Sequence, residues 1–222
     1  MTPHALPAPG LADRPADLLV VLGALALAPV VLVTLTSFLK MAVVLSITRS
    51  ALGAPQVPPG TAVTGLALLL TVVAMAPVAE DAWARARSVP AGGLDRTLEA
   101  ASAAAEPLRE FLARFARRDD CEAFLDLARR ARRGDRAGVT ERDLAVLAPA
   151  FVVSELRRAF TMGFLVFLPF LVVDLLVANV LLALGLTQLS PTSVALPFKL
   201  LLFVGVDGWK LLARGLVLGY VA

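Results

Sequence analysis

Four ionisable side chains interrupt the apolar residues 160–210 of this 222-residue chain: Asp174, Lys199, Asp207 and Lys210. An unpaired charge inside an apolar helix is costly, so each of these residues needs a partner. Buried charges of this kind can form ion pairs that fix one helix packing. They can also contact a partner in an oligomer or carry a proton or an ion, and the sequence leaves these roles open.

The spacing of these residues suggests how they pair. If the apolar stretch 160–198 folds back at 186–191, Asp174 and Lys199 lie at similar depth on opposite arms of a helical hairpin. Asp207 and Lys210 are three residues apart, a spacing at which side chains meet on one helix. Asp174 and Asp207 are also a candidate two-carboxylate protease dyad, but each has a cation nearby. The pattern therefore favours ion pairs over catalysis.

Rare residue types exclude several kinds of chemistry. The chain has one histidine, His4, and one cysteine, Cys121. A histidine-dependent triad, a histidine-rich metal site, an intramolecular disulfide and a cysteine cage for zinc or iron–sulfur are therefore excluded. Neither a GxxxxGK[ST] loop nor a strand-associated GxGxxG is present. We expect no catalytic residue, no enzymatic activity, no bound metal and no cofactor.

The distribution of charge indicates a membrane protein with one solvated insert. Hydrophobic residues make up 58% of the chain and charged residues 18%, whereas a soluble domain has about 25% charged residues. Of the 39 charged residues, 5 lie in 1–79, 26 in 80–143 and 8 in 144–222. Arginines of the middle part alternate with acids, which is typical of solvated helices and not of a nucleic-acid surface.

The expected organisation is all-α, in four parts. Residues 1–17 form a proline-rich tail, which lacks the basic region that opens a secretory signal. A first apolar helical hairpin follows in 18–79, then a polar amphipathic insert in 80–148 and a second apolar hairpin in 149–222.

Within this organisation, four apolar segments are nominally transmembrane. The first, 18–39, is long enough to cross a membrane as one helix kinked at Pro29, and the second is 60–79. The last two are the arms of the second hairpin, of which the final one runs from about residue 193 to the C-terminus. Three- and four-residue apolar spacing predicts insert helices at 94–105, 107–118 and 121–133, with Pro107 in a first turn.

Several long motifs, in order along the chain, resemble one family, the FliP/SctR proteins. The N-terminal motifs are 36–40 (TSFLK), 65–68 (GLAL) and a turn with Arg49, Gly53, Gln56, Pro58 and Pro59. The central one is 149–156 (PAFVVSEL), which contains Ser154 and Glu155. The C-terminal ones are 168–171 (LPFL), 196–204 (LPFKLLLFV) and 206–209 (VDGW).

The resemblance implies a role in protein export. Such proteins form the core of the export gate of type III secretion systems, in flagella and in injectisomes. It implies a wall and gate of an inner-membrane-associated channel for unfolded polypeptides. The implied partners are further copies in a homopentamer, SctT/FliR-like and SctS/FliQ-like subunits, further export-apparatus proteins and membrane lipid. The implied location is the bacterial inner membrane, multi-pass, with much of the assembly on the periplasmic side.

Two departures from the family pattern bear on function. Family members often carry methionines after the glycine at the hairpin break, where they form a gasket in the closed pore. Leu186, Thr187 and Gln188 stand there in this chain, and we take them as candidates for the pore constriction. Flagellar members usually begin with a cleaved signal, so its apparent lack here favours an injectisome component.

Two other functions remain as alternatives. An independent four-span channel or transporter has the same hydropathy pattern, and an intramembrane enzyme would use the two aspartates. The small residues Gly215 and Gly219, four apart, let helices approach closely and mildly favour assembly over a free-standing permease.

Overall fold

The computed structural model describes residues 15–54, 58–90, 94–132 and 138–221. These residues form the helices α1 (Pro15–Thr34), α2 (Phe38–Ala51), α3 (Gly60–Ser88), α4 (Leu94–Phe115), α5 (Arg118–Ala131), α6 (Leu144–Ala183), α7 (Pro191–Gly205) and α8 (Gly208–Val221). No strand occurs in this part of the chain. The predicted all-α class is confirmed.

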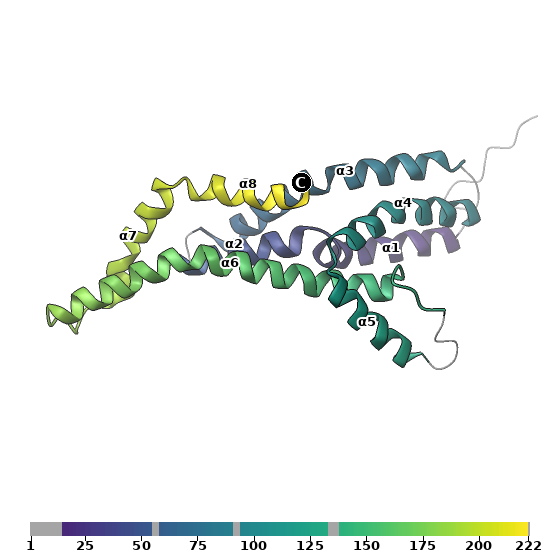
Figure 1. The fold of residues 1–222 in the computed structure, drawn as a ribbon. Coiled ribbons are helices and arrows are strands. Elements are labelled where there is room, and N and C mark those ends of the chain that lie inside the picture. The colour runs from purple at the N-terminus through teal and green to yellow at the C-terminus, as the bar shows by residue number, and fades with distance from the viewer. Residues whose placement is uncertain (1–14, 55–57, 91–93, 133–137, 222) are drawn as a thin grey trace, which may run out of the picture.

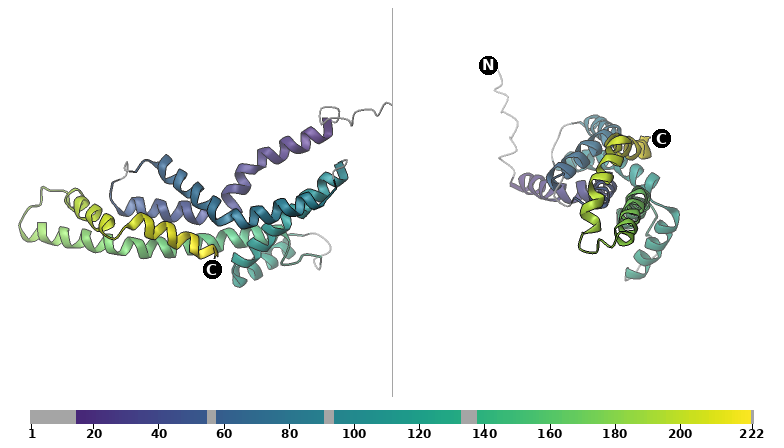
Figure 2. Two further views of the ribbon diagram at one scale, coloured as in Figure 1. Left: turned by 90° about the horizontal axis from the view of Figure 1, so that it is seen from above. Right: turned by 90° about the vertical axis from the view of Figure 1, so that its left-hand side faces the viewer.

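The molecule is elongated along α6, whose 40 residues span about 60 Å. Figure 1 shows α7 folding back beside the C-terminal part of α6, while α5 lies against its N-terminal part. Helix α2 packs against both α6 and α3, and α4 and α8 each pack on α3. The views in Figure 2 show the same arrangement from above and from one end, with the α6–α7 turn at one extreme of the molecule.

The core lies where α2, α3, α4, α6 and α8 meet. Its fully buried side chains include Met41 and Leu45 of α2, Leu112 of α4 and Phe151 of α6. A smaller cluster of Ala51, Leu52, Phe170 and Phe203 joins the end of α2 to the α6–α7 hairpin. These apolar contacts hold the helices whose polar residues form the candidate site.

Among the described residues, two helices have the length and composition to cross a membrane, α3 and α6. The most apolar window of each is mostly exposed within the chain. Large exposed side chains on α6 include Phe160, Phe164 and Leu165. Because α3 continues past residue 79, the first apolar hairpin and the polar insert share one helix.

Three expected helix boundaries were wrong. The segment 18–39 is not one helix, because α1 continues through Pro29 and ends at Thr34. The Thr36 hydroxyl accepts a hydrogen bond from the Phe38 N–H at 3.2 Å, which stabilises the break before α2.

The other two corrections concern the insert and the last segment. Pro107 lies inside the continuous helix α4 and does not begin a new helix. The last segment is not one helix either, because α7 ends at Gly205 and α8 begins at Gly208. Asp207, in the break between them, has a φ of 54°, a left-handed conformation that a continuous helix does not allow.

Candidate functional site

Lys199 joins the two arms of the apolar α6–α7 hairpin to each other and to the end of α2. Lys199 Nζ of α7 lies 2.6 Å from Asp174 Oδ2 of α6 and donates a second hydrogen bond, at 3.1 Å, to the carbonyl oxygen of Ala51. The Lys199 side chain is 4% exposed and that of Asp174 34%. Ala51 is the last residue of α2, so Lys199 also places a positive charge at a helix C-terminus, where the helix dipole favours it.

The turn after α2 explains why a glycine is needed beside this pair. Gly53 has a φ of +75°, a conformation in which a side chain would be strained. A Cβ there would lie 3.6 Å from Lys199 Nζ. Arg49, Pro58 and Pro59 border the same turn, with Pro59 directly before α3, and Gln56 lies outside the described residues.

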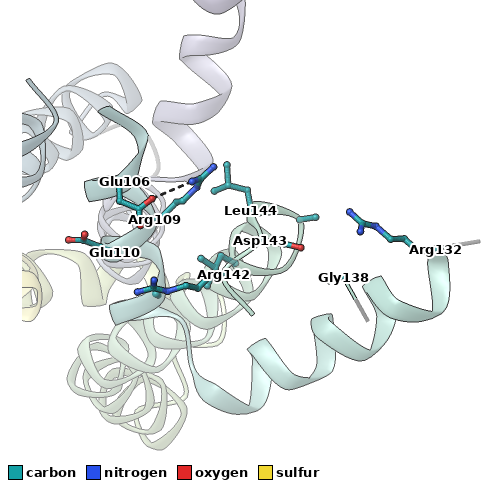
Figure 3. A pocket seen from close by; sticks show the side chains of 11 residues that line it. Glu106, Arg109, Glu110, Arg132, Gly138, Arg142, Asp143 and Leu144 are labelled. Carbon is teal, nitrogen blue, oxygen red and sulfur yellow. Dashed lines mark hydrogen bonds and ion pairs between the residues drawn. The ribbon is translucent and has the colours of Figure 1, made fainter. Parts of the chain in front are cut away.

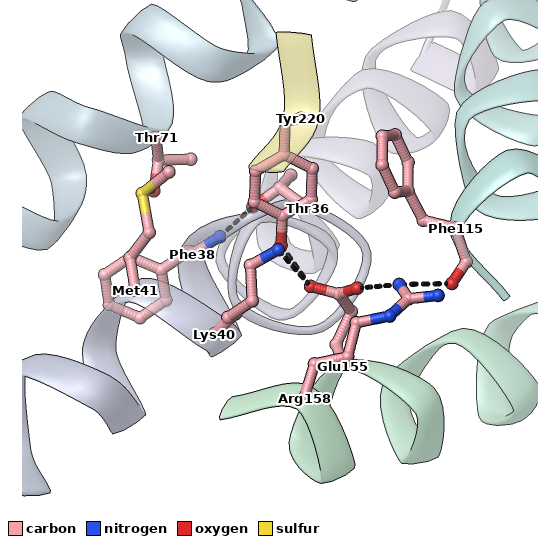
Figure 4. A network of polar contacts seen from close by, with 9 residues as sticks. All are labelled: Thr36, Phe38, Lys40, Met41, Thr71, Phe115, Glu155, Arg158 and Tyr220. Carbon is pink, nitrogen blue, oxygen red and sulfur yellow. Dashed lines mark hydrogen bonds and ion pairs between the residues drawn. The ribbon is translucent and has the colours of Figure 1, made fainter. Parts of the chain in front are cut away.

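A second buried network converges on Glu155, which is fully buried (Figure 4). Its carboxylate accepts a hydrogen bond from Arg158 at 2.6 Å and another from the hydroxyl of Tyr220. Lys40 Nζ lies 3.4 Å from Glu155 and 3.5 Å from the centre of the Tyr220 ring. Arg158 also donates to the carbonyl oxygen of Phe115 at 2.7 Å. One carboxylate therefore joins α2, α6, α8 and the end of α4.

Ser154, the neighbour of Glu155, fixes the insert to α6. Its hydroxyl donates to Asp120 Oδ2 at 2.6 Å and accepts the backbone N–H of Arg117 at 2.8 Å. These bonds hold the first turn of α5, which contains Cys121, against α6. Burial, together with the nearby carboxylates of Glu141, Asp120 and Glu122, raises the pKa of the Cys121 thiol. The thiol is therefore poorly reactive while α5 stays in place.

The remaining C-terminal pair is of a different kind. Lys210 Nζ lies 3.5 Å from Asp207 Oδ2, and both side chains are largely exposed. Asp174 thus pairs with Lys199, and Asp207 pairs with Lys210. The structure assigns them to two separate ion pairs and not to a shared proton.

The three constriction candidates lie together at the tip of the α6–α7 hairpin. Helix α6 ends in a Schellman motif, in which Gly185 has a φ of +69° and the Leu186 N–H donates to the carbonyl oxygen of Leu181 at 2.9 Å. Leu186, Thr187 and Gln188 follow and are exposed. They lie apart from the two buried networks, at the extreme of the molecule.

Sequence reasoning missed several residues of these networks. Lys40 ends the motif 36–40, but no feature of the neighbouring sequence indicated that its side chain lies close to Glu155. Tyr220, the single tyrosine of the chain, is followed by only two residues. Its position in an apolar segment could have indicated that its hydroxyl bonds to a buried polar group, since a buried phenol usually has a hydrogen-bond partner.

A cavity of about 490 Å³ lies between α4 and the start of α6 (Figure 3). Its charged lining residues are Glu106, Arg109, Glu110, Arg132, Arg142 and Asp143. Glu106 pairs with Arg109 at 3.3 Å, and Glu110 pairs with Arg85 at 3.1 Å. With both charge signs on its walls, this cavity does not select one class of ligand. Within the described residues, no group of three metal-ligating side chains is found.

Comparison with known proteins points to one family. The model of the FliP family matches residues 21–216. The probable translocation protein y4yL of Sinorhizobium fredii is 44% identical over 206 residues, which are 91% of this chain and 93% of that protein. The Yop proteins translocation protein R of Yersinia pestis is 42% identical over 207 residues, 92% of this chain and 95% of the relative.

A flagellar relative matches as well. The flagellar biosynthetic protein FliP of Caulobacter vibrioides is 43% identical over 214 residues, 94% of this chain and 77% of that protein. The relatives are thus translocation proteins and flagellar biosynthetic proteins, and the resemblance indicated by the sequence motifs is confirmed. Because the matched residues extend over most of its length, this chain belongs to the FliP family.

Proposed function

We propose that this chain is a non-enzymatic subunit of the type III export apparatus, forming part of the wall and gate of its channel for unfolded polypeptides. The observation that carries the proposal is the α6–α7 hairpin. The Lys199–Asp174 pair joins its two arms, the hydrogen bond from Lys199 to Ala51 fixes it to α2, and its tip presents Leu186, Thr187 and Gln188 to the exterior. A fixed arm with an exposed tip is suited to hold a constriction in place.

The exposed apolar surface supports a role inside an assembly. A soluble monomer rarely exposes a large contiguous apolar patch, yet α3 and α6 are mostly exposed along their apolar windows. We propose that these faces contact lipid, further copies of the chain in a homopentamer, and SctT/FliR-like and SctS/FliQ-like subunits. The chain would then lie in the bacterial inner membrane as a multi-pass protein, with much of the assembly on the periplasmic side.

The arrangement of the acids supports a structural role over catalysis. Asp174 and Glu155 each lie in a network that joins helices, and Asp207 is an exposed partner of Lys210. Energy for export would then come from another component of the apparatus.

Co-expression tests this proposal against an independent channel. The chain is produced alone and with the SctT/FliR-like and SctS/FliQ-like subunits of the same organism, and each product is weighed by native mass spectrometry. We expect a complex with five copies of this chain when the partners are present, and no ion conduction by the chain alone in liposomes. A monomer that conducts ions alone would contradict the proposal.

Which type III system the chain serves is a separate proposal. We propose an injectisome, although relatives of both the Yop and the flagellar kind match. In a strain that lacks its own injectisome subunit of this family, the chain should restore effector secretion. In a strain that lacks flagellar FliP, it should not restore swimming. The reverse result would assign it to flagella.

A further inference from the structure

An apolar groove of about 330 Å³ runs between α6 and α8, with the end of α7 at one side, and none of its lining residues belongs to the polar networks described above. It is lined only by apolar side chains and glycines: Met162, Val166, Pro169, Phe170, Phe203, Val206, Gly208, Leu211, Leu212 and Gly215. A groove without a polar group can take only an apolar occupant, since a buried polar group would lack a hydrogen-bond partner.

Gly215 keeps the groove open on the α8 side. A Cβ at Gly215 would meet no atom within 4 Å, so this position borders open space. The opposite wall belongs to α6, one of the two candidate membrane spans. In a membrane, the apolar molecule next to such a wall is the acyl chain of a lipid.

The two ends of the groove differ in charge. Helix α8 runs antiparallel to α6. Near the end of α8, Tyr220 donates a hydrogen bond to Glu155 of α6. At the start of α8, Gly208 lies against Phe203, which packs against Phe170 of α6. The end beside Gly208 is apolar, and the nearby Asp207 and Lys210 form an ion pair.

The other end carries positive charge. Arg214, three residues after Leu211 and directly before Gly215, lies on the flank of the lining face. Its side chain is exposed and forms no ion pair with any described residue. Arg158, one turn before Met162 on α6, is already paired with Glu155 at 2.6 Å, so Arg214 is the cation that this end offers to a ligand.

We propose that the α6–α8 groove binds an anionic phospholipid, with an acyl chain along Met162–Phe170 and the phosphate at Arg214. An apolar channel with a cationic mouth complements this class of molecule, in which a negative phosphate is attached to a long apolar chain. A zwitterionic lipid presents a compensating positive group and is bound less well. The proposal does not depend on the gate function, because lipid binding needs neither substrate nor partner subunits.

Native mass spectrometry of the full chain in detergent tests the proposal. Phosphatidylglycerol and phosphatidylcholine with identical acyl chains are added in turn, and the bound lipid is counted. We expect about fivefold tighter retention of phosphatidylglycerol, since one basic residue near a membrane surface attracts anionic lipid by about that factor. Arg214→Gln should remove the preference, and Gly215→Leu should abolish retention of both lipids by filling the groove.

Gly65→Leu is the matched control, because Gly65 also borders open space but lies on α3, outside the groove. It should retain lipid as the unmodified chain does. Equal retention of the two lipids by the unmodified chain, or normal retention by Gly215→Leu, would overturn the proposal. A disulfide between two copies of the Gly215→Cys, Cys121→Ser variant, whose single cysteine is at position 215, would also overturn the proposal. A second copy of the chain would then occupy the groove.

Discussion

At the scale of single residues, the buried Lys199–Asp174 pair makes the sharpest prediction. Asp174→Asn leaves the buried Lys199 charge with neutral oxygens alone as partners, and removing the opposite charge of a buried pair costs about 3–5 kcal/mol. Lys199→Met leaves an aspartate that is 34% exposed, so it should cost less. The free energy of unfolding in detergent, measured with a denaturant, gives both values.

The exposed pair on α8 is the control for this prediction. Lys210→Met removes a surface ion pair, which is worth at most about 1 kcal/mol. A loss for Asp174→Asn no larger than the loss for Lys210→Met would show that the Lys199 contact does not stabilise the fold. Exchanging Asp174 and Lys199 should restore stability only in part, because an aspartate at 199 would face the Ala51 carbonyl oxygen.

Cys121 reports whether α5 is docked on α6. Because burial raises the pKa of this thiol, the thiolate forms at lower pH in the unfolded chain than in the folded one. The neutral Cys121 thiol therefore contributes fully to the stability of the fold at a pH below its pKa in the unfolded chain. This contribution is lost as the pH rises through the higher pKa of the folded chain. We expect slow alkylation at pH 8 and faster alkylation in Ser154→Ala, which lacks the bond to Asp120.

Thr161→Ala is a suitable comparison, since the Thr161 hydroxyl bonds only to the carbonyl oxygen of Arg157 on its own helix. Its Cys121 should be alkylated as slowly as in the unmodified chain. Equal alkylation rates in the unmodified chain and in Ser154→Ala would mean that Ser154 does not hold α5.

At this scale the sequence predicted some contacts and not others. The proximity of Asp174 and Lys199 followed from their similar distance to one turn. The bond from Lys199 to Ala51 joins residues 148 apart, and no local pattern encodes such a contact. The same holds for Tyr220 and Glu155, because the path of α8 back along α6 is set by tertiary packing.

At the scale of elements, α2 and α6 come close together at Gly163. A Cβ at Gly163 would lie 2.4 Å from Ile47 Cδ1, so α2 and α6 approach closely because this residue has no side chain. Gly163→Ala should destabilise the fold by about 1–3 kcal/mol through overpacking. Gly65→Ala, in open space on α3, should instead stabilise it by up to about 1 kcal/mol. Thermal unfolding of the two variants compares them, and similar shifts in both would contradict the close α2–α6 contact.

Helix boundaries were harder to predict than helix existence. Pro107 was expected to start a helix, but α4 contains it, because tertiary packing of its buried side chains Phe111 and Leu112 outweighs one lost hydrogen bond. The break at 35–37 contains neither glycine nor proline and gave no signal. The glycines at 185 and 53 did mark real turns, since both have positive φ.

At the scale of the whole molecule, composition and motifs predicted the class and the family. The low share of charged residues indicated apolar helices, and the ordered motifs indicated the FliP family. Hydropathy did not reveal which apolar faces pack within the chain and which stay exposed. That division depends on contacts such as α2 on α6, which join segments distant in sequence.

Site-directed crosslinking of a stalled substrate tests the gate most directly. Single cysteines replace Leu186 or Gln188 in a Cys121→Ser background within the assembled complex, with Leu127→Cys on α5 as an exposed control far from the tip. We predict that a translocating polypeptide crosslinks to positions 186 and 188 and not to position 127. Crosslinking at neither tip position while the substrate is stalled in the complex would contradict the assignment of this hairpin as the gate.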